Sequence, residues 1–311
     1  MDDLGTLLGI WAHPDDETYL TAGLMAQAVR DGHRVVCVTA TRGEGGSMDE
    51  ERWPPATMGQ VREAELMRCF EILGVTEHHW LGERDVDMDT GLSEAGYEQV
   101  RDIMADVRPD TVLTFGPDGM TGHVAHMSVS EWATRALAEV GKPGAAVHYA
   151  TYPQEWADEF VPIYNAFDVF RPGTPPITPH DELSIDFELP SDLLELKLRA
   201  IAEHESQVGG MIEAFGEDIF RRAMKAEWFR RGAVKPWRPV VRRRSPTSTG
   251  IPSARVCSRI VPSTCGRNSW SAFRICRSRA GGRPRRSTTR SRSMFRTSPC
   301  PTTRSSRTCT T

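Results

Sequence analysis

Residues 7–17 read LLGIWAHPDDE, and this segment joins two kinds of structure. Its first five residues form an apolar run with the length of a buried strand, and a polar turn follows. Apolar side chains then recur at four-residue spacing at Leu20, Leu24 and Ala28, until Gly32 ends the pattern. The segment therefore predicts a buried strand, a turn rich in charged groups, and a helix.

The alternation of strand and helix continues along the chain. Further strands are expected at residues 35–38, 78–81, 111–115 and 147–150, and helices at about 60–73, 97–107, 126–140 and 193–201. Such alternation predicts a mostly parallel sheet covered by helices on both faces. The expected fold class is α/β, a Rossmann-like doubly wound single domain whose strands lie in the order 3-2-1-4-5.

In that order the first and fourth strands are neighbours, and ligands bind at their carboxyl ends. The segments at those ends are residues 12–17 and 116–126, and both contain clustered His and Asp. His13, Asp16 and His126 form a set of nitrogen and oxygen ligands that suits one zinc ion and leaves a fourth position for water. Each segment by itself is also an ordinary turn or helix N-terminus, so the prediction depends on their joint placement.

The neighbouring residues suggest a reaction. Asp15 would remain free beside the metal, where a carboxylate can take a proton from metal-bound water. His123 could face the substrate carbonyl and, as an imidazolium, stabilise the developing oxyanion. The pattern predicts a hydrolase in which water attacks an amide. A Gly-x-Gly-x-x-Gly turn does not follow the first strand, which disfavours a dinucleotide-binding dehydrogenase.

Residues 12–17 resemble the signature of the PIG-L/LmbE-like family of zinc-dependent N-acetylglucosaminyl deacetylases. Segments at 41–45, 62–65, 114–123 and 197–207 resemble other elements of that family in the same order. The resemblance covers roughly residues 5–232. It implies a deacetylase domain, taken as residues 1–240, that removes an acyl group, expected to be acetyl, from an N-acyl amino sugar or related amide.

The resemblance implies the same metal ligands, base and electrophile as the residue types do. It also implies that Arg62 and Asp85 hold sugar hydroxyls, whereas the residues alone allow Arg62 to pair with Glu65 and Asp85 to be a turn residue. One departure is visible, because the family often has His-Pro-Asp-His where residues 123–126 read His-Val-Ala-His. A carboxylate that could orient an imidazole is missing, and such a loss can weaken metal binding or activity about 10–100-fold.

Two segments break the alternating pattern. Residues 152–190 are rich in proline with little periodicity, and we expect a long excursion over the site. Residues 241–311 hold 17 of the 38 basic side chains, all Arg, and no Asp or Glu, so residues 1–240 carry a net charge of −21. This tail is expected to be disordered, or to be the product of a shifted reading frame.

Three other functions stay open on the residues alone. They are a Rossmann-like sugar-nucleotide transferase or binding module that holds Mg²⁺, a non-haem Fe(II) oxygenase, and a nucleic-acid binder that uses the arginine-rich tail. Two His ligands favour zinc over Mg²⁺, and the acidic body opposes binding to nucleic acid.

The composition also bears on partners and location. No stretch approaches ~20 apolar residues and the chain does not begin with a basic segment that leads into an apolar run, so we expect a cytoplasmic protein with a small-molecule substrate and no membrane partner. The sequence predicts no particular oligomeric state.

Overall fold

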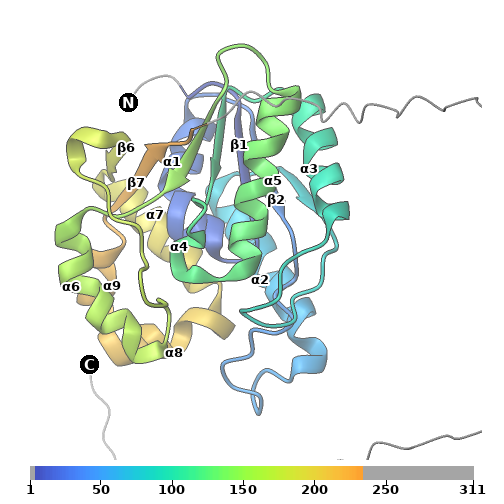
Figure 1. Cartoon of the computed structure of the whole chain (residues 1–311). Coiled ribbons are helices and arrows are strands. Elements are labelled where there is room, and N and C mark those ends of the chain that lie inside the picture. Colours follow the sequence, from blue (N-terminus) through green and yellow to red (C-terminus); the bar gives the residue numbers. More distant parts are fainter. Residues whose placement is uncertain (1–3, 234–311) are drawn as a thin grey trace, which may run out of the picture. The chain divides into compact units, whose positions relative to one another are not determined.

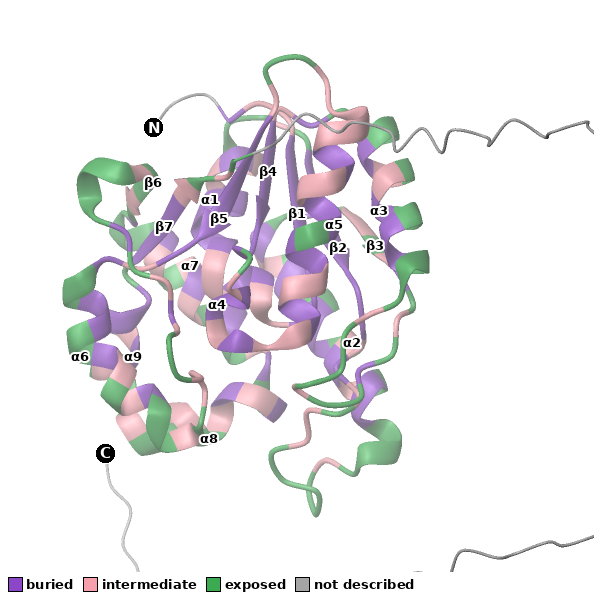
Figure 2. Ribbon diagram, viewed as in Figure 1, coloured by how far each residue is buried: buried purple, intermediate pink, exposed green. Residues whose placement is uncertain are grey.

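The centre of the fold is a parallel sheet of five strands, most of which are rich in apolar residues. Its five strands are β1 (Leu7–Trp11), β2 (Val35–Thr39), β3 (Glu77–Trp80), β4 (Thr111–Thr114) and β5 (Ala146–Ala150). Every residue of β1, β2, β4 and β5 is buried, as strands covered on both faces require (Figure 2). Their order is β3-β2-β1-β4-β5, which confirms the predicted winding. This computed structural model describes residues 4–233.

Two antiparallel strands extend the sheet beyond β5. They are β7 (Ala226–Arg231), which pairs with β5, and β6 (Leu183–Glu188) at the edge. The sequence analysis expected neither strand. Residues 183–188 alternate between apolar and polar side chains, the pattern of a half-buried strand, but they lie within the segment that was assigned to the proline-rich excursion. The sheet is therefore mixed but mostly parallel.

Helices cover both faces of the sheet (Figure 1). One face carries α3 (Glu94–Val107) and α5 (Val124–Val140), which pack against each other. The other carries α1 (Asp16–Arg30), α2 (Pro55–Leu73) and α7 (Ser191–Ala202), with α7 against both α1 and α2. Within residues 4–233 no helix has the length and apolar character needed to cross a membrane.

A second, smaller hydrophobic core packs part of residues 152–190, the segment expected to form an excursion, against later elements of the chain. It involves α6 (Gln154–Tyr164), α8 (Glu205–Phe215) and α9 (Glu217–Ala223), and short 3-10 turns lie at Asn165–Phe167 (η1) and His180–Glu182 (η2). Trp156, Phe160, Phe220 and Trp228 are members of this core. Residues 152–190 are thus more ordered than their proline content predicts. The prediction for residues 241–311 lies outside the described residues.

Candidate metal centre and active site

The predicted site residues meet where β1 and β4 end. These strands pair in parallel, with Gly9 opposite Leu113, so the segments that follow them emerge side by side. His13 comes two residues after β1, Asp16 begins α1, and His126 lies in the first turn of α5, which follows the short helix α4 (Gly119–Gly122). The structure brings together the three residues predicted as metal ligands.

Their donor atoms lie close together, and His123 also places a ring nitrogen within 4.8 Å of those of His13 and His126. His13 Nδ1 lies 3.1 Å from His126 Nε2 and 3.6 Å from Asp16 Oδ2, and His126 Nε2 lies 3.5 Å from Asp16 Oδ1. Zinc at bond lengths of about 2.0–2.1 Å in a tetrahedron separates neighbouring donors by about 3.3 Å. The spacing and the two-His, one-carboxylate chemistry therefore fit a zinc ion. We call these three residues the metal cluster.

Second contacts fix which nitrogen of each imidazole is free. His126 Nδ1 donates to the carbonyl oxygen of Gly119 at 2.9 Å, which leaves Nε2 with its lone pair. His13 Nε2 is buried without a hydrogen-bond partner and lies 3.5 Å from Asp85 Oδ1, so a proton on Nε2 faces that carboxylate. A backbone carbonyl thus orients His126 in a chain that lacks the carboxylate often found between the two histidines in the resembling family.

The charges around the metal cluster favour a cation at its centre. Burial by itself lowers the pKa of His13, but the nearby carboxylates of Asp16 and Asp85 raise it to about 9, so His13 holds a proton that a bound metal ion would displace. Burial also opposes ionisation of Asp16, yet His126 and His13 hold the pKa of Asp16 well below its usual range. The pKa of His126 is lowered to about 4, mainly by burial, so this imidazole is neutral, as a metal ligand must be.

Asp15 lies beside the metal cluster in a strained conformation. Its φ of 132° is rare for a residue with a side chain, and such strain is common where structure serves chemistry. Its Oδ2 lies 3.1 Å from Arg62 Nη2. Burial raises the pKa of Asp15 to about 6, and the charge of Arg62 opposes that rise. At pH 7 the carboxylate is ionised and has the basicity of a proton acceptor.

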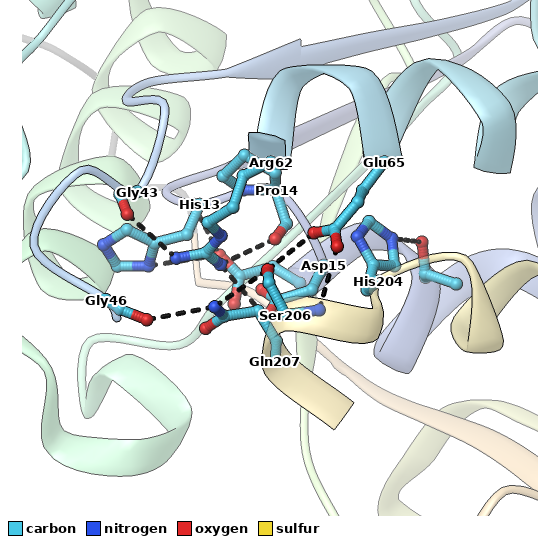
Figure 3. A network of polar contacts seen from close by, with 12 residues as sticks. His13, Pro14, Asp15, Gly43, Gly46, Arg62, Glu65, His204, Ser206 and Gln207 are labelled. Carbon is cyan, nitrogen blue, oxygen red and sulfur yellow. Dashed lines mark hydrogen bonds and ion pairs between the residues drawn. The ribbon is translucent and has the colours of Figure 1, made fainter. Parts of the chain in front are cut away.

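Arg62 supports the loop that carries Asp15. Its buried guanidinium donates to the carbonyl oxygens of Pro14 at 2.7 Å and Gly43 at 3.3 Å (Figure 3). A Cβ on Gly43 would lie 2.1 Å from Arg62 Nη1, so only glycine allows this approach. Arg62 and Asp85 are both buried within the site, and Asp85 Oδ1 lies 3.5 Å from His13 Nε2. Their predicted contacts with sugar hydroxyls stay a prediction.

His123 lies at the N-terminus of α5, next to the metal cluster. Its Nδ1 accepts a hydrogen bond from the backbone N–H of Ala125 at 3.2 Å, and its ring stacks on His126 with 4.9 Å between centroids. Burial and the nearby His13 lower the pKa of His123 to about 3. The low pKa favours a neutral imidazole over the imidazolium expected from the sequence, because the charged form would be desolvated beside other histidines. A neutral His123 carries its proton on Nε2.

A second buried cluster was not anticipated. Glu17, Cys69 and His204 place ligand-type atoms within 4.8 Å of one another. The Thr18 hydroxyl lies between them, 2.7 Å from Glu17 Oε1, 2.9 Å from Cys69 Sγ and 3.0 Å from His204 Nε2. We call this group the Thr18 cluster. Glu17 and His204 belong to the quoted motifs, but their convergence with Cys69 needs the packing of α2 against α7.

Polar bonds also tie the start of α8 to this region. The Glu65 carboxylate accepts from the backbone N–H and the hydroxyl of Ser206 at 2.8 and 2.7 Å, and Gln207 Nε2 donates to the Gly46 carbonyl oxygen at 3.0 Å (Figure 3). Glu65 is therefore bonded to α8, not paired with Arg62. The C-terminal helices are held against the loop that follows β2.

A pocket opens beside Asp15, Asp16 and His126. Residues 152–170 contribute to its wall, which confirms that the excursion covers the site. Tyr19 and Tyr164 contribute to its lining, and the hydroxyl oxygen of each is buried without a hydrogen-bond partner. Sequence reasoning missed both tyrosines, since the only local pattern around each of them is that of an ordinary helix.

Comparison with known proteins gives concordant matches. A family model described as GlcNAc-PI de-N-acetylase matches residues 8–137. The chain is 31% identical over 232 residues to a 1D-myo-inositol 2-acetamido-2-deoxy-alpha-D-glucopyranoside deacetylase of Actinosynnema mirum, across 65% of this chain and 80% of that protein. A protein of the same description from Saccharomonospora viridis is 29% identical over 233 residues, or 65% of this chain and 85% of its own length.

Among solved structures, the N,N'-diacetylchitobiose deacetylase from Pyrococcus horikoshii has a similar fold. The TM-score is 0.52 at 22% sequence identity, and the match covers 73% of this chain and 83% of that one. This likeness independently supports the three-layer α/β architecture with the sheet at its centre.

Proposed function

Because the chain belongs to the PIG-L family of deacetylases, we propose that it is a zinc-dependent hydrolase that removes the acetyl group from an N-acetylglucosamine-type substrate. Deacetylases of this kind are amidohydrolases, enzymes that break a C–N bond with water. The observation that carries the proposal is the placement of an ionised carboxylate, Asp15, beside three donor atoms spaced for one ion.

His13, Asp16 and His126 would hold the metal, each with its second contact in place. Zinc bound there supplies Lewis-acid chemistry, which polarises a carbonyl and lowers the pKa of water from 15.7 towards about 7. Two imidazoles with one carboxylate suit zinc better than Mg²⁺, which prefers oxygen ligands. The donor set thus disfavours the alternative of a Mg²⁺-dependent sugar-nucleotide transferase.

Asp15 acts as the general base. Its carboxylate accepts a proton from the water whose oxygen attacks the amide carbonyl carbon, with Arg62 holding the carboxylate at 3.1 Å. The C–N bond then breaks, the proton passes to the leaving amine, and acetate is the second product. A pKa near 6 serves both steps, because the group is ionised before the attack and still basic enough to be protonated.

His123 stabilises the oxyanion. Because its Nδ1 accepts from the helix backbone, Nε2 carries the proton and can donate a hydrogen bond to the carbonyl oxygen as negative charge develops there. A neutral donor avoids placing a further positive charge next to a bound metal. His123 and Asp15 therefore divide the work, one stabilising the oxygen of the substrate and the other moving the proton.

Acetate release tests the proposal. Full-length protein loaded with one equivalent of zinc should release acetate from a simple N-acetylglucosaminide, and chelation should stop the release. Replacement of His123 by Gln, which keeps a donor, should retain more activity than replacement by Ala. If zinc-loaded protein releases no acetate from any N-acetylglucosaminide, the proposed function is refuted.

A further inference from the structure

The pocket beside the catalytic residues has a volume of about 280 Å³. Asp15, Asp16 and His126 lie on one side of it, where the scissile amide would bind. The remaining walls come from six segments of the sequence and consist mainly of aromatic and methionine side chains. Among these are Met48, Met88, Met120, Tyr152, Phe167 and Phe170.

Such a lining selects for apolar groups. Burial of an apolar substituent against aromatic rings and flexible methionines is favourable without any hydrogen bond, and methionine adapts to irregular shapes. Met48 is 62% exposed although it is a large apolar residue, and it lies at this pocket. Met48 can therefore contact an apolar group that enters the pocket without first breaking contacts of its own.

The charges of the pocket exclude one class of substrate. Its charged residues are acidic, Asp15, Asp16 and Asp168, and none of the residues of the described chain that line it is Lys or Arg. Away from the metal cluster and Arg62, a phosphate or carboxylate on the substrate would meet no cationic side chain of the lining and would be repelled by Asp168. The group that enters the pocket is therefore uncharged.

Two tyrosine hydroxyl groups at the pocket lack a hydrogen-bond partner. The oxygens of Tyr19 and Tyr164 are buried with no hydrogen-bond partner, although both side chains line the pocket. Buried hydroxyls are usually bonded, so this pair points to an acceptor on the ligand. Burial raises the pKa of both tyrosines, so each remains protonated and can donate.

We propose that this pocket is a substrate subsite for an uncharged aromatic or aliphatic substituent next to the hydrolysed amide, with Tyr19 and Tyr164 donating to an oxygen beside that substituent. The inference rests on the proposed deacetylase function and adds the substrate class to it, an N-acyl amino sugar with an apolar group and not a phosphorylated one. The substituent could belong to the aglycone or to the acyl group, and both present the same chemistry to the pocket.

Zinc-loaded full-length protein tests the subsite with four probes. These are methyl N-acetylglucosaminide, phenyl N-acetylglucosaminide, methyl N-phenylacetylglucosaminide and N-acetylglucosamine 1-phosphate. We expect kcat/KM to rise about tenfold or more from the methyl glycoside to one of the phenyl probes, and the phosphate to be the poorest substrate. Which phenyl probe gains identifies the aglycone or the acyl group as the occupant.

Binding gives a readout that does not depend on turnover. Calorimetric titration of the Asp15→Asn protein should show tighter binding of the preferred phenyl probe than of the methyl glycoside. Tyr164→Phe in that background should weaken binding of the phenyl probe about fivefold, whereas Tyr97→Phe, on α3 outside the pocket, should not. Met48→Gln should lower the phenyl-to-methyl ratio severalfold, while Met67→Gln, an exposed methionine of α2, leaves it unchanged.

The outcomes separate the two proposals. Equal binding of phenyl and methyl probes, or tightest binding of the phosphate, overturns the subsite even if acetate is released. Tight, Tyr164-dependent binding of a phenyl probe without hydrolysis of any probe, to acetate or to phenylacetate, supports the subsite and refutes the amide-hydrolase function.

Discussion

Two clusters of side chains that could bind a metal each include a carboxylate from adjacent residues of α1, Asp16 in the metal cluster and Glu17 in the Thr18 cluster. They differ in what lies at the centre. In the metal cluster the donor atoms face one another, and Asp16 and His126 line the open pocket. In the Thr18 cluster the side chains are fully buried and a hydroxyl bonds to every member. Successive residues of a helix point about 100° apart, which sends one carboxylate to the pocket and the other to the core.

The comparison teaches that residue types alone do not define a metal site. Both clusters contain a His, a carboxylate and a third ligand-type residue within a few ångströms. Only the metal cluster has free lone pairs fixed by second contacts, together with access from the pocket. We therefore expect changes in the metal cluster to affect zinc and catalysis, and changes in the Thr18 cluster to affect stability.

The largest expected effect is on zinc content. His126→Ala should reduce bound zinc from about one ion per chain to near zero, because a three-ligand site loses one donor. Cys69→Ser is the matched control in the Thr18 cluster and should keep its zinc. Elemental analysis after dialysis measures both, and the reverse result would exchange the roles of the two clusters.

Removal of the base should come next. Asp15→Asn should lower kcat for acetate release about 10²–10⁴-fold, since Asn cannot accept the proton from water. Zinc content and the midpoint of urea unfolding should stay close to those of the parent protein. A variant that retains most of its kcat would show that another group acts as the base.

Disruption of the Thr18 cluster should lower the free energy of unfolding. Thr18→Val preserves shape but leaves buried Glu17 and His204 without the hydroxyl, which we expect to cost about 3 kcal/mol in the free energy of unfolding. Zinc content should not change. Urea denaturation followed by circular dichroism measures the cost, and a variant that is as stable as the parent but loses zinc would contradict this division.

Replacement of Arg62 distinguishes two possible roles of this residue, support of the loop that carries Asp15 and binding of the substrate. Arg62→Lys keeps the charge but not the fork that bonds Pro14 and Gly43, so it should lower kcat roughly 10–100-fold with little change in KM, because Asp15 is misplaced. Steady-state kinetics separate the two constants. A rise in KM alone would instead favour the contact with sugar hydroxyls that the family resemblance implies.

The smallest effect concerns a buried histidine outside both clusters. Burial, with Arg231 nearby, lowers the pKa of His148 to about 4, from an ordinary value of about 6.5 in the unfolded chain. His148 is neutral when folded, so stability is complete above pH 6.5 and is lost as pH falls towards 4, where the unfolded state binds the extra proton. The loss should be about 1 kcal/mol between pH 6.5 and 5.5.

The His148→Gln variant checks that reasoning. It should have a shallower fall in the free energy of unfolding over the same pH range, with urea melts at pH 7.5 as the reference. An unchanged slope in the variant would assign the acid sensitivity to other groups.

Much of the fold was predictable because the patterns that specify its strands and helices involve residues close together in the sequence. The runs at β1 and β4 and the glycine after α1 specify strands and a helix end through neighbours in the sequence, and parallel winding then follows from alternation. Strands β6 and β7 escaped prediction. They form an antiparallel edge in which β7 pairs with β5 and β6 pairs with β7. The alternating residues of β6 were available as a signal, but the prolines around them favoured a loop.

The candidate site also has some features that the sequence predicts and others that it does not. The convergence of His13, Asp16 and His126 could be predicted because strand order alone places the segments after β1 and β4 together. The charge of His123 could not, since it depends on burial next to other histidines. Nor could the bonding of Arg62 to Pro14 and Gly43, which requires two loops to approach without a Cβ between them.

The sequence by itself determined the α/β winding, the place of the site and the residue types that can bind zinc, because periodicity and turn chemistry act between neighbours in the chain. The tertiary structure decided which carboxylate faces the pocket, which cluster is closed by a hydroxyl, and which side chains form the apolar wall. Those features join segments more than a hundred residues apart, as Thr18 with His204 and Asp15 with Tyr164 show. Packing of helices and loops on the sheet sets their distances, and no local pattern encodes it.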